Sequence, residues 1–206
     1  MYNQPETDFL NRFTTLPVLL DMLSRQCITL LGPTNWEDRN DAYYLEKYKA
    51  NKQLKTLLAC CFSTKRETFH HWKVFSNGPS GVCIEFNSHK LLSMVETVEG
   101  ISFRPVSYRL IKHNQNPSLG AWPFLKRKAF EDEGEFRIIY ENPFIEKKTK
   151  EIRFDLECIE KITLSPWMPK PIAKSVAKVI RDIKHCEDIT VVGSSLLESS
   201  GWKNCL

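Results

Sequence analysis

The chain has 206 residues, and its 29 Lys and Arg against 25 Asp and Glu give a formal net charge of +4. Apolar residues make up 42% and charged residues 26%, a composition typical of a folded protein rather than a disordered one. The pI of about 8.6 lies below the ~9 of a strongly basic nucleic-acid-binding domain, so it permits nucleic-acid contact without requiring it. Neither G-x-G-x-x-G nor G-x-x-x-x-G-K-[ST] occurs, which argues against a Rossmann turn and a P-loop.

Seven cysteines are present, an odd number, and several lie in apolar runs such as 57–62. This usage predicts buried thiols in a reducing compartment. The first residues carry neither the basic nor the apolar region of a signal peptide, and no apolar run approaches the ~18 residues of a spanning helix. We therefore expect a cytoplasmic protein that does not act in a membrane.

Apolar side chains recur at helical spacing in some segments and form short, strand-like runs in others. In chain order we predict a helix over 16–23, a strand over 28–31, a turn over 36–41, a helix over 43–55, a strand over 57–62, a helix over 64–72, strands over 81–86, 135–140, 152–154 and 159–164, a helix over 172–183 and a strand over 189–192. Strands outnumber helices without regular alternation, which favours an α+β fold with a mixed, mostly antiparallel sheet and flanking helices. No linker or repeat divides the chain, so residues 1–206 are expected to form one domain.

The sharpest local feature is the acidic run 131–135, which leads into an apolar strand. Because side chains alternate along a strand, Glu133, Glu135 and Arg137 are expected to share one face. Repulsion between the two carboxylates would raise one pKa, and the arginine would lower the other. Such a pair suits a site that stabilises positive charge and moves a proton; the alternative is an acidic loop before an exposed edge strand.

Three weaker signals accompany the acidic run. Ser63 and Thr64 end the most apolar strand, where they would either face a cleft or cap the next helix. Arg12 lies on a short strand, where it would bind a phosphate or carboxylate or form a surface ion pair. A basic stripe on the 172–183 helix would follow a phosphate backbone or face solvent. Its members are Lys170, Lys174, Lys178, Arg181 and His185.

Metal chemistry is not indicated by the spacing of histidine and cysteine. The pair His70–His71 and the cysteines Cys60, Cys61 and Cys83 do not form a C-x-x-C, H-E-x-x-H or deaminase-type pattern. A cysteine nucleophile is also not supported, because thiols in apolar strands are inert. We therefore expect no metal cofactor.

The longer motifs WEDRND, CCFST…HHWKVF…GVCIEF and EDEGEFRIIY resemble a widespread family of uncharacterised bacterial proteins. Some members of this family occur among phage-resistance (abortive-infection) genes. The resemblance covers most of residues 9–165. Asp38 and Asp41 match the family's acidic turn, but Arg39 stands where proline is usual, and Phe75 replaces the tyrosine of a Trp-x-x-Tyr motif.

A second resemblance is to the ADP-ribosyltransferase toxins, whose pattern is an arginine, a serine motif and an E-x-E motif in that order. Here these are Arg12, Ser63-Thr64 and Glu133-Gly134-Glu135, with Lys65 in place of the last serine of Ser-Thr-Ser. This resemblance implies a split-sandwich fold that binds NAD as a substrate. It implies that Arg12 holds the diphosphate, that Ser63 and Thr64 lie at the nicotinamide ribose, and that Ser63 orients Glu135.

The resemblance also implies the chemistry. An aromatic side chain, Trp72 or Phe69, would stack on nicotinamide. Glu135 would stabilise the oxocarbenium-like charge through the ribose 2′-OH, and Glu133 would position or deprotonate the acceptor. Asp38 and Asp41 would shape the cleft or merely form turns.

Superfamily members modify protein, DNA or RNA, and the basic stripe favours a nucleic acid, with RNA preferred. A toxin of this kind would need a neutralising antitoxin protein.

Two other functions stay open. In a metal-dependent nuclease, Asp41, Glu85 and Lys90 would form an acidic Mg²⁺ site, although the five-residue spacing of the last two does not fit. In a non-enzymatic adaptor, the acidic run would bind a basic partner.

Overall fold

A computed structural model describes the protein over residues 7–36, 38–76, 78–110 and 117–205. The helices are α1 (Leu16–Arg25), α2 (Arg39–Asn51), α3 (Phe69–Phe75), α4 (Ser88–Glu96), α5 (Lys170–Arg181) and α6 (Ser200–Lys203). The strands are β1 (Phe9–Thr15), β2 (Cys27–Leu31), β3 (Thr56–Ser63), β4 (Gly81–Asn87), β5 (Ile101–Pro105), β6 (Ser107–Arg109), β7 (Leu125–Arg127), β8 (Glu135–Asn142), β9 (Thr149–Arg153), β10 (Ile159–Leu164) and β11 (Val191–Gly193). Short 3₁₀ helices cover Pro33–Asn35, Gly78–Ser80, Leu119–Phe124 (η3), Lys128–Glu133 (η4) and Leu156–Cys158. No helix within the described ranges is long and apolar enough to cross a membrane.

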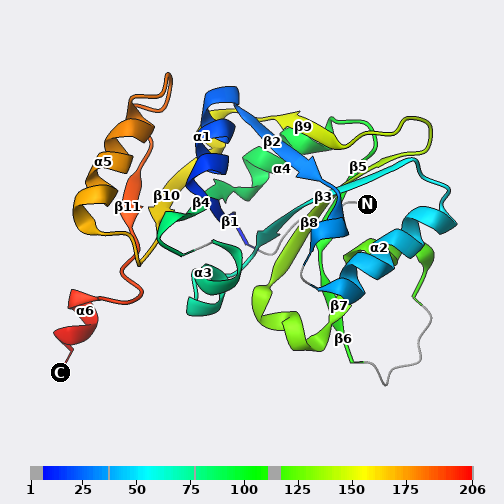
Figure 1. The fold of residues 1–206 in the computed structure, drawn as a ribbon, viewed down its shortest axis with the longest axis horizontal. Coiled ribbons are helices and arrows are strands. Elements are labelled where there is room, and N and C mark those ends of the chain that lie inside the picture. The colour runs from blue at the N-terminus through cyan, green and yellow to red at the C-terminus, as the bar shows by residue number, and fades with distance from the viewer. Residues whose placement is uncertain (1–6, 37, 77, 111–116, 206) are drawn as a thin grey trace.

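The main sheet has nine strands in the order β11-β10-β4-β1-β3-β2-β9, with β8 paired to β3 and β5 paired to β8 (Figure 1). Its pairings are antiparallel except for that between β10 and β11, while β6 and β7 form a separate parallel pair. The predicted α+β fold with a mixed, mostly antiparallel sheet and flanking helices is confirmed.

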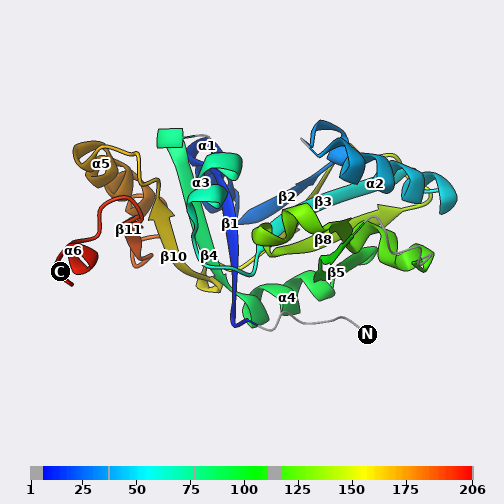
Figure 2. The same cartoon turned by 90° about the horizontal axis from the view of Figure 1, so that it is seen from below.

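The sheet opens between β1 and β3. Strand β1 pairs along its whole length with β4, but it meets β3 only where Asn11 lies opposite Ser63. Strand β2 meets β3 only where Leu31 lies opposite Ala59, whereas β8 pairs with β3 from end to end. The two halves of the sheet therefore diverge (Figure 2), and the edge of β3 between Ala59 and Ser63 faces the opening.

The apolar side chains of β3 pack against both faces of its half of the sheet. Leu58, Cys60 and Phe62 belong to the main core, to which α1 and α4 also contribute, and the intervening Leu57 and Ala59 belong to a second cluster under α2. A strand that is buried on both faces has a continuous apolar sequence rather than an alternating one, which explains why 57–62 is so hydrophobic. Ser63, a predicted NAD-binding residue at the end of β3, is thus held by a strand that is packed on both sides.

Several boundaries near the opening differ from the predictions. Helix α2 begins at Arg39 rather than at residue 43, because Asp38 caps it by accepting a hydrogen bond from the Asn40 backbone N–H at 3.0 Å. Helix α3 begins at Phe69 and is capped by Thr68, so Ser63 and Thr64 are not its caps. Helix α4 and strands β5, β6 and β7 were not predicted.

Candidate active site

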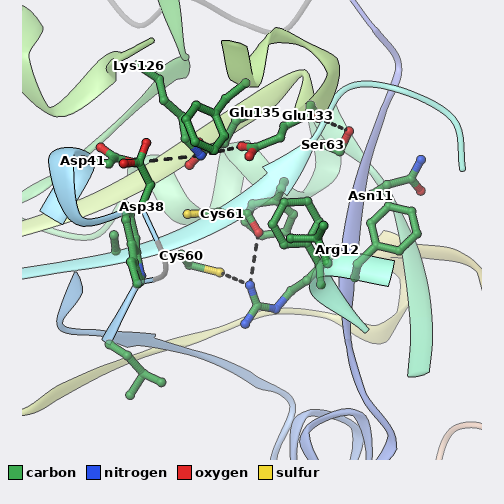
Figure 3. A pocket seen from close by; sticks show the side chains of 18 of the residues that line it. Asn11, Arg12, Asp38, Asp41, Cys60, Cys61, Ser63, Lys126, Glu133 and Glu135 are labelled. Carbon is green, nitrogen blue, oxygen red and sulfur yellow. Dashed lines mark hydrogen bonds and ion pairs between the residues drawn. The ribbon is translucent and has the colours of Figure 1, made fainter. Parts of the chain in front are cut away.

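A pocket of about 440 Å³ lies in the opening of the sheet (Figure 3). Residues of β1, β2 and β3 line one part of it, and side chains near the start of α2, at the end of α3, on β7 and around the η4–β8 turn line the rest. The predicted site residues Arg12, Ser63, Glu133 and Glu135 all line it. Three segments that are far apart in the sequence thus meet at the place where the sheet splits.

Glu135 is the first residue of β8, and two cations fix its carboxylate. Arg137 donates from Nε to Oε1 at 2.6 Å and from Nη2 to Oε2 at 2.8 Å, and Lys126 Nζ lies 3.2 Å from Oε2. Burial acts to raise the pKa of Glu135, but these cations outweigh burial and hold the pKa at about 2. Glu135 is therefore ionised at any physiological pH.

Arg137 is completely buried and anchors both Glu135 and Asp41. Its Nη1 and Nη2 donate to the two Asp41 oxygens at 3.1 and 2.7 Å, and Nη1 also donates to the Pro123 carbonyl at 2.7 Å. All five guanidinium N–H groups are used in this way, so Arg137 has none left for a ligand. The ring of Trp36, which lines the pocket, lies 4.8 Å from the guanidinium carbon. Asp41 is thus part of the site rather than a simple turn residue.

Glu133 has the opposite electrostatic behaviour. Burial raises its pKa, and the neighbouring Glu135 adds to the rise, although Lys126 Nζ donates to Glu133 Oε2 at 2.5 Å. The predicted split of the two pKa values is confirmed in direction, with burial rather than repulsion as the main cause for Glu133. Glu135 and Arg137 share a face of β8 as predicted, but Glu133 does not, because it lies in η4 and not on β8.

A tight turn at Gly134 brings Glu133 back to the pocket. Gly134 has φ +52°, and a Cβ there would lie 2.6 Å from Lys65 Cγ, so both the backbone conformation and the space favour glycine. Thr64 Oγ1 donates to the Gly134 carbonyl at 3.0 Å. Thr64 therefore supports this turn and does not line the pocket.

Ser63 and His71 hold the same turn by the Glu133 carbonyl. Ser63 Oγ accepts from the Lys65 backbone N–H at 3.1 Å and donates to the Glu133 carbonyl at 2.7 Å, and His71 Nε2 lies 3.1 Å from that carbonyl. Because a carbonyl only accepts, Nε2 carries the ring proton, and Nδ1 accepts from Thr68 Oγ1 at 3.0 Å. Burial lowers the pKa of His71, which keeps the ring neutral. Ser63 was predicted to orient Glu135, but its hydroxyl bonds the backbone carbonyl of Glu133 instead, so it fixes the turn that carries both glutamates.

Lys126 lies against the three buried carboxylates Asp41, Glu133 and Glu135, which we call the carboxylate wall of the pocket. The sequence analysis did not identify this lysine. It lies on β7, is nearly buried, and contacts Glu133, Glu135 and, at 3.9 Å, Asp41. Burial acts to lower the pKa of Lys126, but the three carboxylates raise it overall, so the amine stays charged. No motif surrounds Lys126 in the sequence, and only the fold shows its place.

Arg12 lies on the opposite wall of the pocket from these carboxylates (Figure 3). Its Nη1 donates to the Cys61 carbonyl at 3.1 Å and to Cys60 Sγ at 2.8 Å, so Arg12 bonds to the strand edge that the split leaves open. Its Nε is buried and has no hydrogen-bond partner within the described part of the chain. A buried, unpaired N–H of a cation is suited to an anionic ligand. Burial raises the pKa of the Cys60 and Cys61 thiols, so neither is a nucleophile.

The predicted stacking residues are not placed to contact a ligand in this pocket. Trp72 is fully buried, and its indole donates to Glu67 Oε2 at 2.8 Å. Phe69 is exposed but packs on Trp167, outside the pocket. The aromatic residues that do line the pocket are Phe13, Trp36, Phe62, Phe75 and Phe130.

The basic stripe lies away from the pocket. Helix α5 packs beside β11 at one end of the sheet, with β10 and β4 between it and β1 (Figure 1). Its basic side chains, Lys170, Lys174, Lys178 and Arg181, are exposed. Nucleic-acid binding by this stripe stays a prediction.

Neither a protein-family model nor a curated protein sequence matches this chain. The fold is similar to that of DarT from Thermus sp. 2.9. The DarT complex with NAD+ aligns over 93% of this chain and 98% of its own, with 10% identity and a TM-score of 0.48. The DarT complex with ADP-ribosylated ssDNA aligns over 94% of this chain and 98% of its own, with 10% identity and a TM-score of 0.49. The complex with carba-NAD+ aligns over 92% of this chain and 97% of its own, with 11% identity and a TM-score of 0.47. Such a distant similarity concerns the fold, and the function depends on the residues of the pocket.

The two other readings lose their structural basis. Glu85 pairs with Lys161 at 3.2 Å on β4 and does not line the pocket that contains Asp41, so the residues proposed for a nuclease are not brought together. Among the residues described, no group of three or more His, Cys, Asp or Glu side chains is placed to hold a metal ion. Glu133 and Glu135 are buried, which leaves an adaptor only Glu131 and Asp132 as exposed carboxylates of the acidic run.

Proposed function

We propose that this chain is an NAD-dependent ADP-ribosyltransferase, formed by one domain over residues 1–206. The observation that carries the proposal is the buried, ionised carboxylate of Glu135 on a pocket wall opposite Arg12, with Glu133 beside it. The chemistry needs an anion where positive charge develops, a base where a proton leaves, and a cation for the substrate's diphosphate. The pocket supplies one group for each need.

Arg12 would bind the diphosphate of NAD. Its unpaired Nε and its planar donor fork match phosphate oxygens. Trp36, which is held on one side by the Arg137 guanidinium, offers a ring on which nicotinamide or adenine would stack. The pocket volume of about 440 Å³ falls within the ~300–1,000 Å³ typical of small-molecule sites.

Glu135 would act on the bond between nicotinamide and ribose C1′. As that bond breaks, its electron pair leaves with nicotinamide, and positive charge develops on the ribose. The Glu135 carboxylate accepts a hydrogen bond from the 2′-OH and stabilises that charge. The acceptor then forms the new bond to C1′ and gives its proton to Glu133, whose raised pKa makes it the stronger base.

The test uses isotope-labelled NAD with the wild type and two matched glutamate variants. Glu135→Gln should slow nicotinamide release by ~10²–10³-fold, the usual effect of losing one group that stabilises a transition-state charge. Glu141→Gln changes the same residue type on the same strand, but Glu141 binds Lys52 and Tyr48 outside the pocket, so release should continue at the wild-type rate. A folded wild type that neither releases nicotinamide nor transfers label would refute the proposal.

The acceptor, the site of action and the neutralising partner are proposed from the resemblance to ADP-ribosyltransferase toxins. We expect a nucleic-acid acceptor, with RNA favoured over DNA, a cytoplasmic site of action, and a neutralising antitoxin protein in a phage-defence or toxin–antitoxin system. A transferase that modifies nucleic acid in its own cell would hinder expression of the wild type. Glu135→Gln should therefore express well where the wild type does not, and equal growth of both strains would contradict the toxin role.

A further inference from the structure

We propose that the exposed face of α3, together with Trp167, is the surface that binds the acceptor, and that the acceptor there is a single-stranded nucleic acid. The identity of this surface as an acceptor site rests on the proposed transferase function, but its binding can be measured without NAD. We call it the α3 surface and define it by Phe69, Lys73 and Trp167.

The α3 surface combines two aromatic rings with a cation. The rings of Phe69 and Trp167 lie 5.8 Å apart at 71° to each other. Lys73 Nζ lies 4.5 Å from the centre of the Trp167 ring and 5.5 Å from that of Phe69. Phe69 is 52% exposed although it is a large apolar side chain, and the core does not require it there. Rings that accept bases and a cation that meets phosphate are the two components of single-strand binding.

The α3 surface leads directly to the pocket. Val74 and Phe75, at the end of the same helix, line the pocket and are also 41% and 38% exposed. The His70 ring contacts Phe75 at 6.3 Å between centres and continues the exposed face toward Phe69. Helix α3 packs against β1, the strand that carries Arg12 (Figures 1 and 2). A single-stranded nucleic acid bound on α3 would thus present a nucleotide at the mouth of the pocket.

The charge around the α3 surface suits a polyanion. Arg66 and Lys73 are exposed on residues 65–75, where the one acidic residue is Glu67, and Lys65 is exposed too but lies 3.8 Å from Asp132. Glu67 is already bound by the Trp72 indole and by Ser194 Oγ at 2.7 Å. The α5 stripe, by contrast, has exposed lysines but no aromatic residue in 170–181, so it offers charge without a base platform.

The test measures anisotropy of a fluorescein-labelled single-stranded DNA, an RNA of the same sequence and the corresponding duplex, all without NAD. The wild type should bind both single strands more tightly than the duplex, because only unpaired bases are free to stack. The double variant Phe69→Ala/Trp167→Ala should weaken single-strand binding by ~10-fold or more. The control Lys174→Ala/Lys178→Ala removes two charges from α5 and should retain the wild-type preference for single strands.

Nicotinamide release and thermal melting are measured on the same variants. Since Phe69 and Trp167 do not line the pocket, release and folding should persist while transfer to the single strand is lost. Binding that is unaffected by the aromatic variant, or lost only in the α5 variant, would overturn the α3 surface, as would a wild type that binds no nucleic acid. A wild type that binds single strands through α3 but releases no nicotinamide would leave the surface standing and refute the transferase.

Discussion

Glu133 and Glu135 are separated by a single glycine, yet they have different electrostatic surroundings. Arg137 contacts Glu135 through two nitrogens and keeps it ionised, whereas Glu133 is bonded by Lys126 and burial raises its pKa. The residue with the fixed charge suits stabilisation of a cation, and the residue with the raised pKa suits proton transfer. This difference is the basis on which we propose that Glu135 acts in bond cleavage and Glu133 on the acceptor.

The two roles predict two pH profiles. Glu135 has a pKa of about 2, so nicotinamide release should stay flat as the pH is lowered from about 8 toward the ordinary glutamate pKa of ~4.3. Transfer to the acceptor needs unprotonated Glu133, so it should fall first, as the pH drops through the raised Glu133 pKa. The measurement is the ratio of transferred to released ADP-ribose against pH. Glu133→Gln should lower transfer and abolish this acid limb; an acid limb that survives the substitution would show that another group titrates.

At the scale of elements, Arg137 joins three of them. It lies on β8, binds Asp41 of α2 through two hydrogen bonds and binds the carbonyl of Pro123 in η3. Removing one partner of a buried ion pair leaves the other charge buried and unpaired. The stability lost in this way is much larger than the net stability that the intact pair contributes. Arg137 is thus the residue through which the helix, the strand and the 3₁₀ segment hold the carboxylate wall together.

We predict that Arg137→Met lowers the free energy of unfolding by ~3–5 kcal/mol at neutral pH, measured by urea denaturation. Without the arginine, the folded-state pKa of Glu135 rises above its unfolded value, and the pKa of Asp41, which burial already raises, rises further. Protonation then favours the folded state, so the loss relative to wild type should shrink as the pH is lowered toward ~4. Arg25→Met, which removes an exposed ion pair with Glu151, serves as the control and should change stability little. A pH-independent loss would attribute the effect to packing instead of charge.

A helix or strand can be predicted from the sequence when residues close to it along the chain determine where it begins and ends. Helix α1 was predicted because Leu16, Leu19 and Leu23 recur at helical spacing, and Leu19 and Leu23 are indeed buried. The start of α3 was misplaced because Thr64 and Thr68 are equally good caps in the sequence. Thr64 is instead bonded to the Gly134 carbonyl, 70 positions along the chain, and no local pattern reports such a contact.

At the scale of the whole molecule, the pocket exists because β1 leaves β3 after one residue pair. Composition and hydrophobic runs predict strands, but they do not tell which strands pair along their length and which diverge. Arg12, Ser63 and Glu135 were nevertheless grouped correctly, because a known pattern of spaced motifs connects them. Lys126 and the fully bonded Arg137 belong to no such pattern, and only the fold brings them to the carboxylates.

The opening of the sheet also predicts how the stability of the whole molecule responds to NAD, the proposed substrate. A ligand that binds only the folded state stabilises it by RT ln(1 + [L]/Kd), which is ~2.7 kcal/mol at a hundredfold excess over Kd. For a chain of this size, that stabilisation corresponds to a rise in Tm of roughly 5–10 °C. NAD should therefore raise the Tm of Glu135→Gln, which keeps the Arg12 wall but does not consume the ligand. Arg12→Ala should lose the shift relative to its own Tm, while Arg181→Ala on α5 should keep it. A shift that survives Arg12→Ala would place the diphosphate elsewhere in the cleft, and no shift in any variant would mean that the opening between β1 and β3 does not bind NAD.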